Sequence, residues 1–193
     1  MIRVTVTLDG AAAARLAWIA AQIARPEALY RAAGRAVANR LRRHFRELDG
    51  QRANRLGGKR QHFWLQVRTA TQDPEVEPGG ATVTIAHLAF AQKLYGGTIV
   101  AKRARALTIP LHPDAYGRRA SVFEQEQGVQ LFRPKGKRVL MADLDGTGAV
   151  PIYVLAKAIT QAPDPEALPD RSELEAEVLR AGERVLGRLG AEG

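Results

Sequence analysis

The spacing of apolar residues divides the chain into predicted elements. Apolar and polar residues alternate over residues 2–8, which predicts a half-buried strand. An alanine-rich run over residues 11–24 and a second run over 27–48 carry apolar residues every three or four positions, and each predicts a helix. Residues 49–61 contain three glycines and no apolar period, so we expect a mobile basic loop there.

Short apolar runs in the middle of the chain predict a series of strands. They cover residues 63–71, 81–86, 107–111, 128–132, 138–142 and 152–159. An acidic connector rich in Pro and Gly joins the first two, and a basic turn over 133–137 joins the fourth and fifth as a hairpin. Residues 87–94 predict a short helix that ends at Gly96 in a left-handed conformation. Residues 112–126 carry weak signals, and we expect an inserted loop.

The C-terminal part predicts a linker and a helix. Residues 162–169 contain three prolines, which is typical of a stiff linker. The helix is expected from Asp170, with Ser172 and Glu175 spaced as a capping box. Its apolar stripe comprises Leu174, Val178, Leu179, Val185, Leu186 and Leu189.

The order of these elements predicts an α+β fold. It has two N-terminal helices, a mainly antiparallel β-sheet and a C-terminal amphipathic helix. We expect a core domain over residues 1–161, which includes a basic helix and loop over 31–68, and a linker with its helix over 162–193.

Composition limits the class of protein. The 193 residues are 46% hydrophobic and 25% charged, as in globular domains, and the absence of cysteine excludes disulfides and thiolate sites. The first residues resemble a strand rather than a signal peptide, and no apolar run approaches the length of a membrane span. We therefore expect a soluble protein that is made and used in a reducing compartment.

The positive charge is concentrated in one segment. Residues 31–68 hold eleven Lys and Arg against two acids, which equals the net charge of +9, whereas the tail from Pro163 is acidic. This polarity favours a polyanion partner or head-to-tail packing between copies, and a solvated helix face is the alternative. The predicted DNA- or partner-facing surface comprises Arg40, Arg42, Arg43, Arg46, Arg52, Arg55, Lys59 and Arg60.

One motif resembles a catalytic site but lacks its context. Residues 139–148, VLMADLDGTG, resemble the first motif of haloacid-dehalogenase phosphatases, yet only 45 residues follow and they do not offer the remaining α/β domain. The same residues resemble half of a calcium loop, but Val154 stands where a bidentate Glu is required. We expect a tight turn between strands, rich in Asp and Gly.

The sequence shows no other sign of catalysis. The four histidines lie in separate segments without metal-ligand spacing, and no nucleophile elbow or phosphate loop is present. We therefore predict no enzyme activity, no catalytic residues, no cofactor and no metal.

A family resemblance lies in the segment from His87 to Leu111. An apolar run leads into Gly-Gly-Thr-Ile, then a Lys- and Ala-rich stretch, then Leu-x-Ile-Pro; its key residues are Tyr95, Gly96, Gly97, Thr98, Ile99, Leu107, Ile109 and Pro110. This resembles the virion-morphogenesis proteins of bacteriophages, the tail-completion or neck family of Mu-like and other long-tailed phages. Residues 152–160 resemble the closing strand of that family, whereas its Arg-Pro-Phe before the last helix is replaced by Ala-Leu-Pro-Asp at 167–170.

The resemblance implies a structural virion protein at the head–tail junction. Such proteins resemble ring-forming subunits, commonly six, around the channel through which DNA passes. The implied partners are other copies of the chain in a hexameric ring, head connector or portal-side proteins, the tail terminator or tail tube, and double-stranded DNA in non-specific contact, with no membrane. The implied location is the virion, assembled in the cytoplasm of the bacterial host. The alternative is a stand-alone basic nucleic-acid-binding protein.

Overall fold

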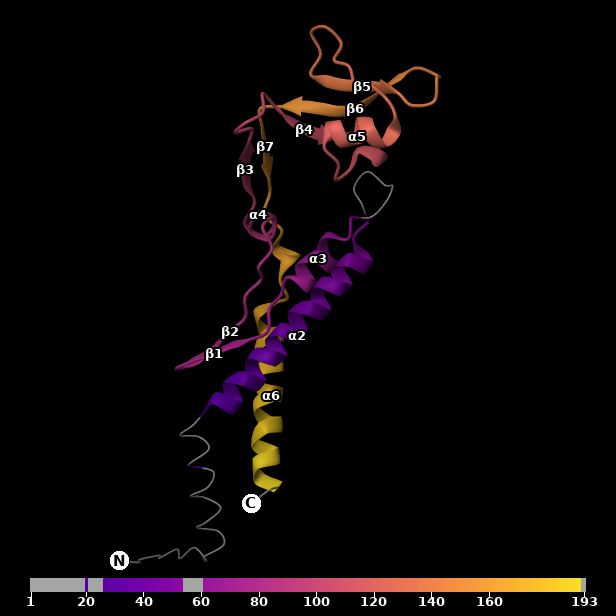
Figure 1. Cartoon of the computed structure of the whole chain (residues 1–193). Helices are drawn as coiled ribbons and strands as arrows, with labels where there is room; N and C mark the ends of the chain where they lie inside the picture. Colours follow the sequence, from indigo (N-terminus) through magenta and orange to yellow (C-terminus); the bar gives the residue numbers. More distant parts are fainter. Residues whose placement is uncertain (1–19, 21–25, 54–60, 192–193) are drawn as a thin grey trace, which may run out of the picture. The chain divides into compact units, whose positions relative to one another are not determined.

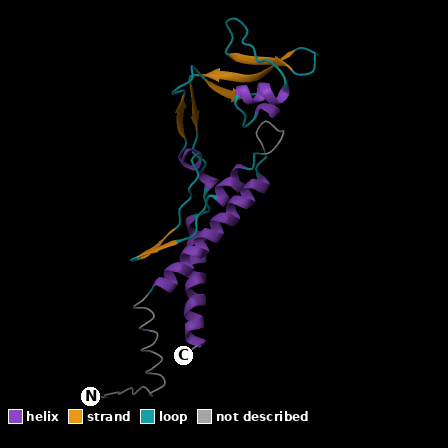
Figure 2. Ribbon diagram, viewed as in Figure 1, coloured by secondary structure: helices purple, strands orange, loops and turns teal. Residues whose placement is uncertain are grey.

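Helices and antiparallel sheets make up the described part of the chain. The structure is a computed structural model that describes residues 20, 26–53 and 61–191. Its strands form three antiparallel sheets among the helices (Figures 1 and 2). The predicted α+β class is confirmed. The predicted strand at 2–8 and the helix at 11–24 lie outside the described residues, Ala20 excepted.

The chain forms two compact units. Among the described residues, one comprises 20, 26–44, 67–86 and 168–191; the other comprises 45–53, 61–66 and 87–167. In this division the C-terminal helix groups with the first part of the long N-terminal one, and the boundary expected at residue 162 stays a prediction.

The long helix α2 (Glu27–Gln51) follows the apolar period of its sequence. Ala38, Leu41, Phe45 and Leu48 are buried and recur every three or four residues. The predicted helix over 27–48 is confirmed, and it continues through residues expected in the loop. The carboxylate of the buried Asp49 accepts a hydrogen bond from Nδ1 of His62 over 2.8 Å.

Helix α3 (Phe63–Thr69) stands where the sequence predicts a strand. That prediction was wrong, because aromatic and β-branched residues favour strands but the buried positions follow a helical spacing. Trp64, Val67 and Thr71 are all buried at intervals of three and four. The Thr71 hydroxyl donates to the Val67 carbonyl over 3.0 Å, and Thr71 forms an isolated bridge with Ile85.

The acidic connector contains a strand. β1 (Glu75–Glu77) pairs antiparallel with β2 (Gly80–Thr82) across a turn in which Gly79 has φ of +95°. The strand predicted over 81–86 is confirmed only in its first residues. The connector was expected as a loop because Pro and Gly at both ends mask a three-residue strand.

A three-stranded sheet forms the centre of the second unit. β6 (Ala149–Ala156) pairs with β4 (Leu107–Pro110) on one side and with β5 (Val139–Asp143) on the other. The predicted strand at 107–111 and the turn before β6 are confirmed. The expected hairpin across 133–137 is reduced to a bridge between Phe132 and Met141.

Helix α5 (Ala120–Gln127) packs on this sheet, where a loop was expected. The side chain of Phe123 is fully buried and meets the Tyr153 ring edge to face at 5.9 Å. The Tyr153 hydroxyl donates to the Arg118 carbonyl over 3.1 Å, and burial raises the pKa of Tyr153. One buried aromatic on a charged eight-residue helix leaves little periodicity in the sequence, which explains the wrong prediction. The short helix η1 (Pro113–Ala115) precedes it.

The Gly-Gly segment joins helix α4 (Phe90–Tyr95) to strand β3 (Gly97–Val100). Gly96 ends the helix with φ of +68° and donates to the Gln92 carbonyl over 3.0 Å, as expected of a C-terminal glycine. β3 pairs with β7 (Ala158–Gln161). The apolar segment predicted over 152–159 is therefore two strands, one in each of two sheets.

The proline-rich segment and the last helix are both ordered elements. The short helix η2 (Pro165–Ala167) lies within the expected linker, and its Ala167 is fully buried. α6 (Arg171–Ala191) begins one residue after the predicted start. The predicted capping box is wrong, because Ser172 lies inside the helix and Glu175 accepts a hydrogen bond from Arg171 over 2.7 Å. Ala181 is buried, whereas Leu179 and Leu186 are exposed.

Candidate functional site

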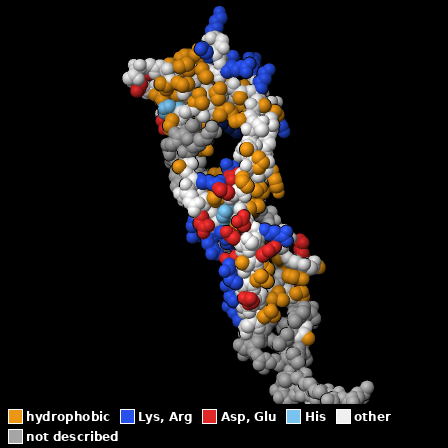
Figure 3. Space-filling view, turned by 180° about the vertical axis from the view of Figure 1, so that it is seen from behind, with side chains coloured by type: hydrophobic (Ala, Val, Ile, Leu, Met, Phe, Trp, Pro, Cys, Tyr) orange, Lys and Arg blue, Asp and Glu red, His pale blue; other side chains and the backbone are white. Residues whose placement is uncertain are grey.

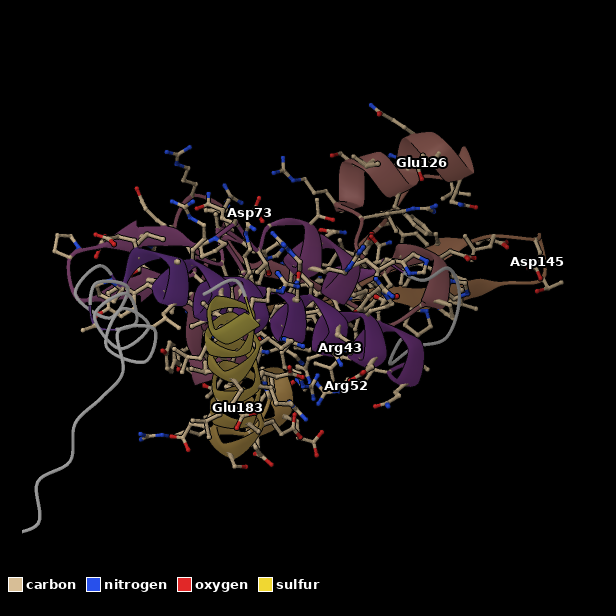
Figure 4. All side chains as sticks on the ribbon, turned by 90° about the horizontal axis from the view of Figure 1, so that it is seen from below. Arg43, Arg52, Asp73, Glu126, Asp145 and Glu183 are labelled. Carbon is tan, nitrogen blue, oxygen red and sulfur yellow. The ribbon has the colours of Figure 1, made fainter. Side chains whose placement is uncertain are left out.

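Two arginines of the predicted basic surface pair with α6. Arg40 binds Glu173, with its Nε 3.0 Å from the carboxylate, and Arg43 lies 3.5 Å from Glu177. Arg40 and Arg43 are one helical turn apart on α2, as are the two glutamates on α6, so the two helices present matching charges. Figure 1 shows α6 beside α2, and Figure 4 labels Arg43.

Arg42 binds the segment that leads into the β1-β2 hairpin. Its guanidinium donates to the Thr71 carbonyl and to the Asp73 carboxylate, both over 2.8 Å. This arginine therefore fixes the end of α3 through a backbone acceptor as well as a charge.

Arg52 is the centre of a charged cluster in the second unit. Its guanidinium binds the carboxylates of Asp164 and Glu166, the latter over 2.7 Å, and lies 5.2 Å from the centre of the Trp64 ring. Lys93 lies 3.6 Å from Asp164, and its carbonyl accepts a hydrogen bond from the Asp164 amide over 3.1 Å. The cluster thus connects the end of α2 with α4 and η2.

The ionisation of this cluster follows from its contacts. The hydrogen bond to Asp164 raises the pKa of Arg52, against the opposing effect of burial. Burial works to raise the pKa of Asp164, but the hydrogen bond and charge of Arg52, with the charge of Lys93, bring it below its ordinary value. Both groups are therefore held in their charged forms.

Half of the residues of the predicted basic surface form ion pairs with acids of the same chain. Arg40, Arg42, Arg43 and Arg52 have carboxylate partners of the same chain, and Arg46 is exposed on α2. Arg55, Lys59 and Arg60 lie outside the described residues. The partners of Arg40, Arg43 and Arg52 were visible in the sequence only as an acidic tail, and the partner of Arg42 lies in the acidic connector. A DNA- or partner-facing role for this surface stays a prediction.

The residues of the family-like motif lie in three elements. Tyr95 ends α4 with 75% of its surface exposed; Gly97, Thr98 and Ile99 lie in β3; Leu107, Ile109 and Pro110 lie in β4. Gly96 is a point of close backbone approach. A Cβ there would lie 2.5 Å from the Gln161 carbonyl oxygen and 2.6 Å from the Pro163 nitrogen. The absence of a side chain at Gly96 therefore lets the end of β7 pass close to the end of α4.

The β3-β7 sheet is a two-stranded ribbon with exposed side chains. Every residue of β3 is exposed, as are the first three of β7, including Ile99, Val100 and Ile159. Thr98 and Thr160 share a hydrogen bond of 3.0 Å between their hydroxyls. Within the described residues the two strands pair only with each other, so each has one free edge.

The aspartates of the phosphatase-like motif are used by their own turn. Asp143 accepts from the Gly146 amide over 2.8 Å, and Asp145 accepts from the amide and hydroxyl of Thr147 over 3.1 and 2.6 Å. The hydrogen bonds from Thr147 lower the pKa of Asp145, which Figure 4 shows in the turn between β5 and β6. This arrangement is that of the predicted tight turn.

Across the described ranges, no group of three or more His, Asp or Glu side chains is placed to hold a metal ion. Along the same residues, no helix combines the length and apolar character that a bilayer crossing requires. Comparisons with protein-family models, with curated proteins and with solved structures find no match.

Proposed function

We propose that this chain is a structural subunit of a tailed phage or prophage particle. It acts as a tail-completion or neck protein that joins the head connector to the tail around the DNA channel. Support comes from the order of its family-like segments, which run from the Gly-Gly element at 96–97 through the strand at 107–110 to the segment at 152–160. The last of these precedes a proline-rich segment and a final helix, as the resemblance implies.

The free β3-β7 ribbon is the observation that carries this proposal. Two-stranded sheets are marginal by themselves in water, and exposed strand edges pair readily with another chain. Ile99, Val100 and Ile159 are 39%, 49% and 37% exposed, so the ribbon offers both apolar side chains and backbone groups. Strand addition between neighbouring copies would cover both.

Such a contact is heterologous when the β3 edge of one copy pairs with the β7 edge of the next. Heterologous contacts that close generate rings. A ring of about six copies around a channel is what the family resemblance implies, with head connector or portal-side proteins on one side and the tail terminator or tail tube on the other. The protein would then reside in the virion after assembly in the host cytoplasm.

Removal of the gene from its phage or prophage tests this role. We expect a lysate in which filled heads and finished tails are present but unjoined, and in which the full chain supplied from a plasmid restores joined particles. Electron microscopy of the lysate provides the measurement. Joined, infectious particles without the chain would contradict the proposal and favour the alternative, a stand-alone nucleic-acid-binding protein.

A further inference from the structure

Three strand ends meet at one end of the β4-β6-β5 sheet. Leu107 at the start of β4 pairs with Ala156 at the end of β6, and Val139 at the start of β5 pairs with Val154 of β6. The segments before β4, before β5 and after β6 therefore emerge together. The Leu155 amide donates to the Arg138 carbonyl over 2.7 Å, and the Ala101 amide donates to the Lys157 carbonyl over 3.1 Å, which ties all three segments to this end.

These segments carry eight basic side chains and no acid. Residues 101–106 have the sequence AKRARA and residues 133–138 have the sequence RPKGKR. All eight basic residues are exposed. We call them the sheet-end cluster: Lys102, Arg103, Arg105, Arg133, Lys135, Lys137, Arg138 and Lys157. Figure 3 shows Lys and Arg side chains beside the hydrophobic area over the sheet.

The charges of the sheet-end cluster have no acidic partner among the described residues. The ion pairs of that part of the chain engage other basic residues, including four arginines of the predicted basic surface. One cluster side chain bonds within its own turn, since Nε of Arg133 donates to the Lys137 carbonyl over 2.8 Å. That contact leaves the positive charge uncompensated.

The acids of this sheet lie at its opposite end. Asp143 ends β5 where it pairs with Ala149, the first residue of β6, and Asp145 lies in the turn between them. The sheet is thus charged with opposite sign at its two ends. Such a distribution directs an anionic partner to the cluster rather than to the sheet as a whole.

We propose that the sheet-end cluster binds the phosphate backbone of duplex DNA. The assignment rests on the proposed neck function for the identity of the polyanion, and it names which surface of the subunit faces the genome. Phosphate contacts by exposed Lys and Arg give affinity without sequence preference, which suits DNA that moves past a fixed ring.

Variants of the full chain in which Gln replaces basic residues test the assignment. The cluster variant is K135Q/K137Q/R138Q. The control, R171Q/R184Q/R188Q, removes the same charge from exposed positions of α6. Fluorescence anisotropy with a labelled duplex of about 30 base pairs, in two unrelated sequences and over a series of salt concentrations, measures the affinity and its salt dependence.

We expect the cluster variant to bind both duplexes at least about tenfold more weakly and to lower the slope of log K against log salt by about 2 to 3. The control should match the natural chain in slope. Equal losses in both variants, or an unchanged cluster variant, would overturn the assignment. So would binding of polyglutamate but not of duplex, which identifies an acidic protein partner instead.

Measurements of folding and of oligomer mass on the same samples distinguish a loss of DNA binding from a loss of fold or of assembly. Circular dichroism and the thermal midpoint show whether each variant is folded, and K102Q/R103Q/R105Q provides a second cluster variant with the same expected result. The mass of the oligomer reports on the neck proposal independently. A ring that persists while no variant changes DNA binding would refute the DNA-facing surface alone; the absence of a ring would count against the neck function.

Discussion

The guanidinium of Arg52 is bonded to the carboxylate of Asp164, although 112 residues separate the two along the chain. The pair connects the residue after α2 with the proline-rich segment before α6, and the Trp64 ring lies against the same guanidinium. The segment expected as a stiff linker is therefore fixed to the second unit by charge as well as by the buried Ala167.

Breaking this pair should destabilise the second unit. The Asp164 side chain is only 13% exposed, so R52M leaves a largely buried carboxylate without its main partner. We expect R52M to lower the free energy of unfolding by about 1.5–3 kcal/mol. The double variant R52M/D164N should lose clearly less than the sum of the single variants. Urea denaturation followed by Trp64 fluorescence, in a W18F background, measures all three; strict additivity would contradict the coupling.

The same carboxylate predicts a pH dependence. The pKa of Asp164 lies below its ordinary value of 3.8, so its contribution to stability is complete above that value and is lost as the pH falls through the folded-state pKa. The difference in unfolding free energy between the natural chain and D164N should stay constant from about pH 7 to pH 5 and shrink below about pH 4. Urea denaturation across this range is the measurement. A difference that is the same at about pH 3 and pH 7 would contradict it.

Two glycines with nearly the same φ differ in ψ and in how closely other atoms approach them. Gly96 and Gly128 have nearly the same φ, +68° and +64°, but a Cβ at Gly96 would meet the Gln161 carbonyl oxygen at 2.5 Å, whereas nothing lies within 4 Å at Gly128. Gly96 also has ψ of −157°, in a region that only glycine occupies readily. We expect G128A to cost about 1 kcal/mol and G96A at least about 2 kcal/mol more. Equal losses in urea denaturation would show that Gly96 is not a packing constraint.

The sequence predicts α2 well because its apolar residues repeat over about five turns, and the fully buried Phe45 lies on that stripe. It fails at α3 because Trp64 and Val67 suggest a strand by residue type, and only their burial reveals helical spacing. It fails at α5 because a single aromatic, Phe123, carries the packing. Short elements depend on tertiary contacts that periodicity does not record.

The candidate surfaces, like the helices, are only partly predictable from the sequence. A count of charges locates the basic segment at 31–68, but the partners of Arg40 and Arg52 are acids more than a hundred residues away, which composition alone does not place. The sheet-end cluster is split over three segments, and strand register brings them together. The charged runs around Lys102 and Lys135 lie far apart in the sequence. They come together because β6, which Lys157 follows, pairs with β4 on one side and with β5 on the other.

A substitution on the β3-β7 ribbon tests its role in assembly, and a residue of similar exposure on α5 provides the control. Ile99, Ile159 and Val122 are 39%, 37% and 37% exposed, but Val122 lies on α5 rather than on the ribbon. Because an exposed charge resists strand addition, I99K should reduce the oligomer mass while changing the unfolding free energy by no more than about 0.5 kcal/mol. V122K should leave the oligomer intact. Loss of assembly in both variants, or in neither, would contradict a role for the ribbon.

The oligomeric state of the purified full chain tests the neck proposal most directly. Native mass spectrometry over a series of protein concentrations, with negative-stain images of the same samples, gives the mass and the shape together. The proposal predicts one closed species of defined copy number, about six, with a central opening. A monomer at every concentration, at low and at physiological salt, would contradict it.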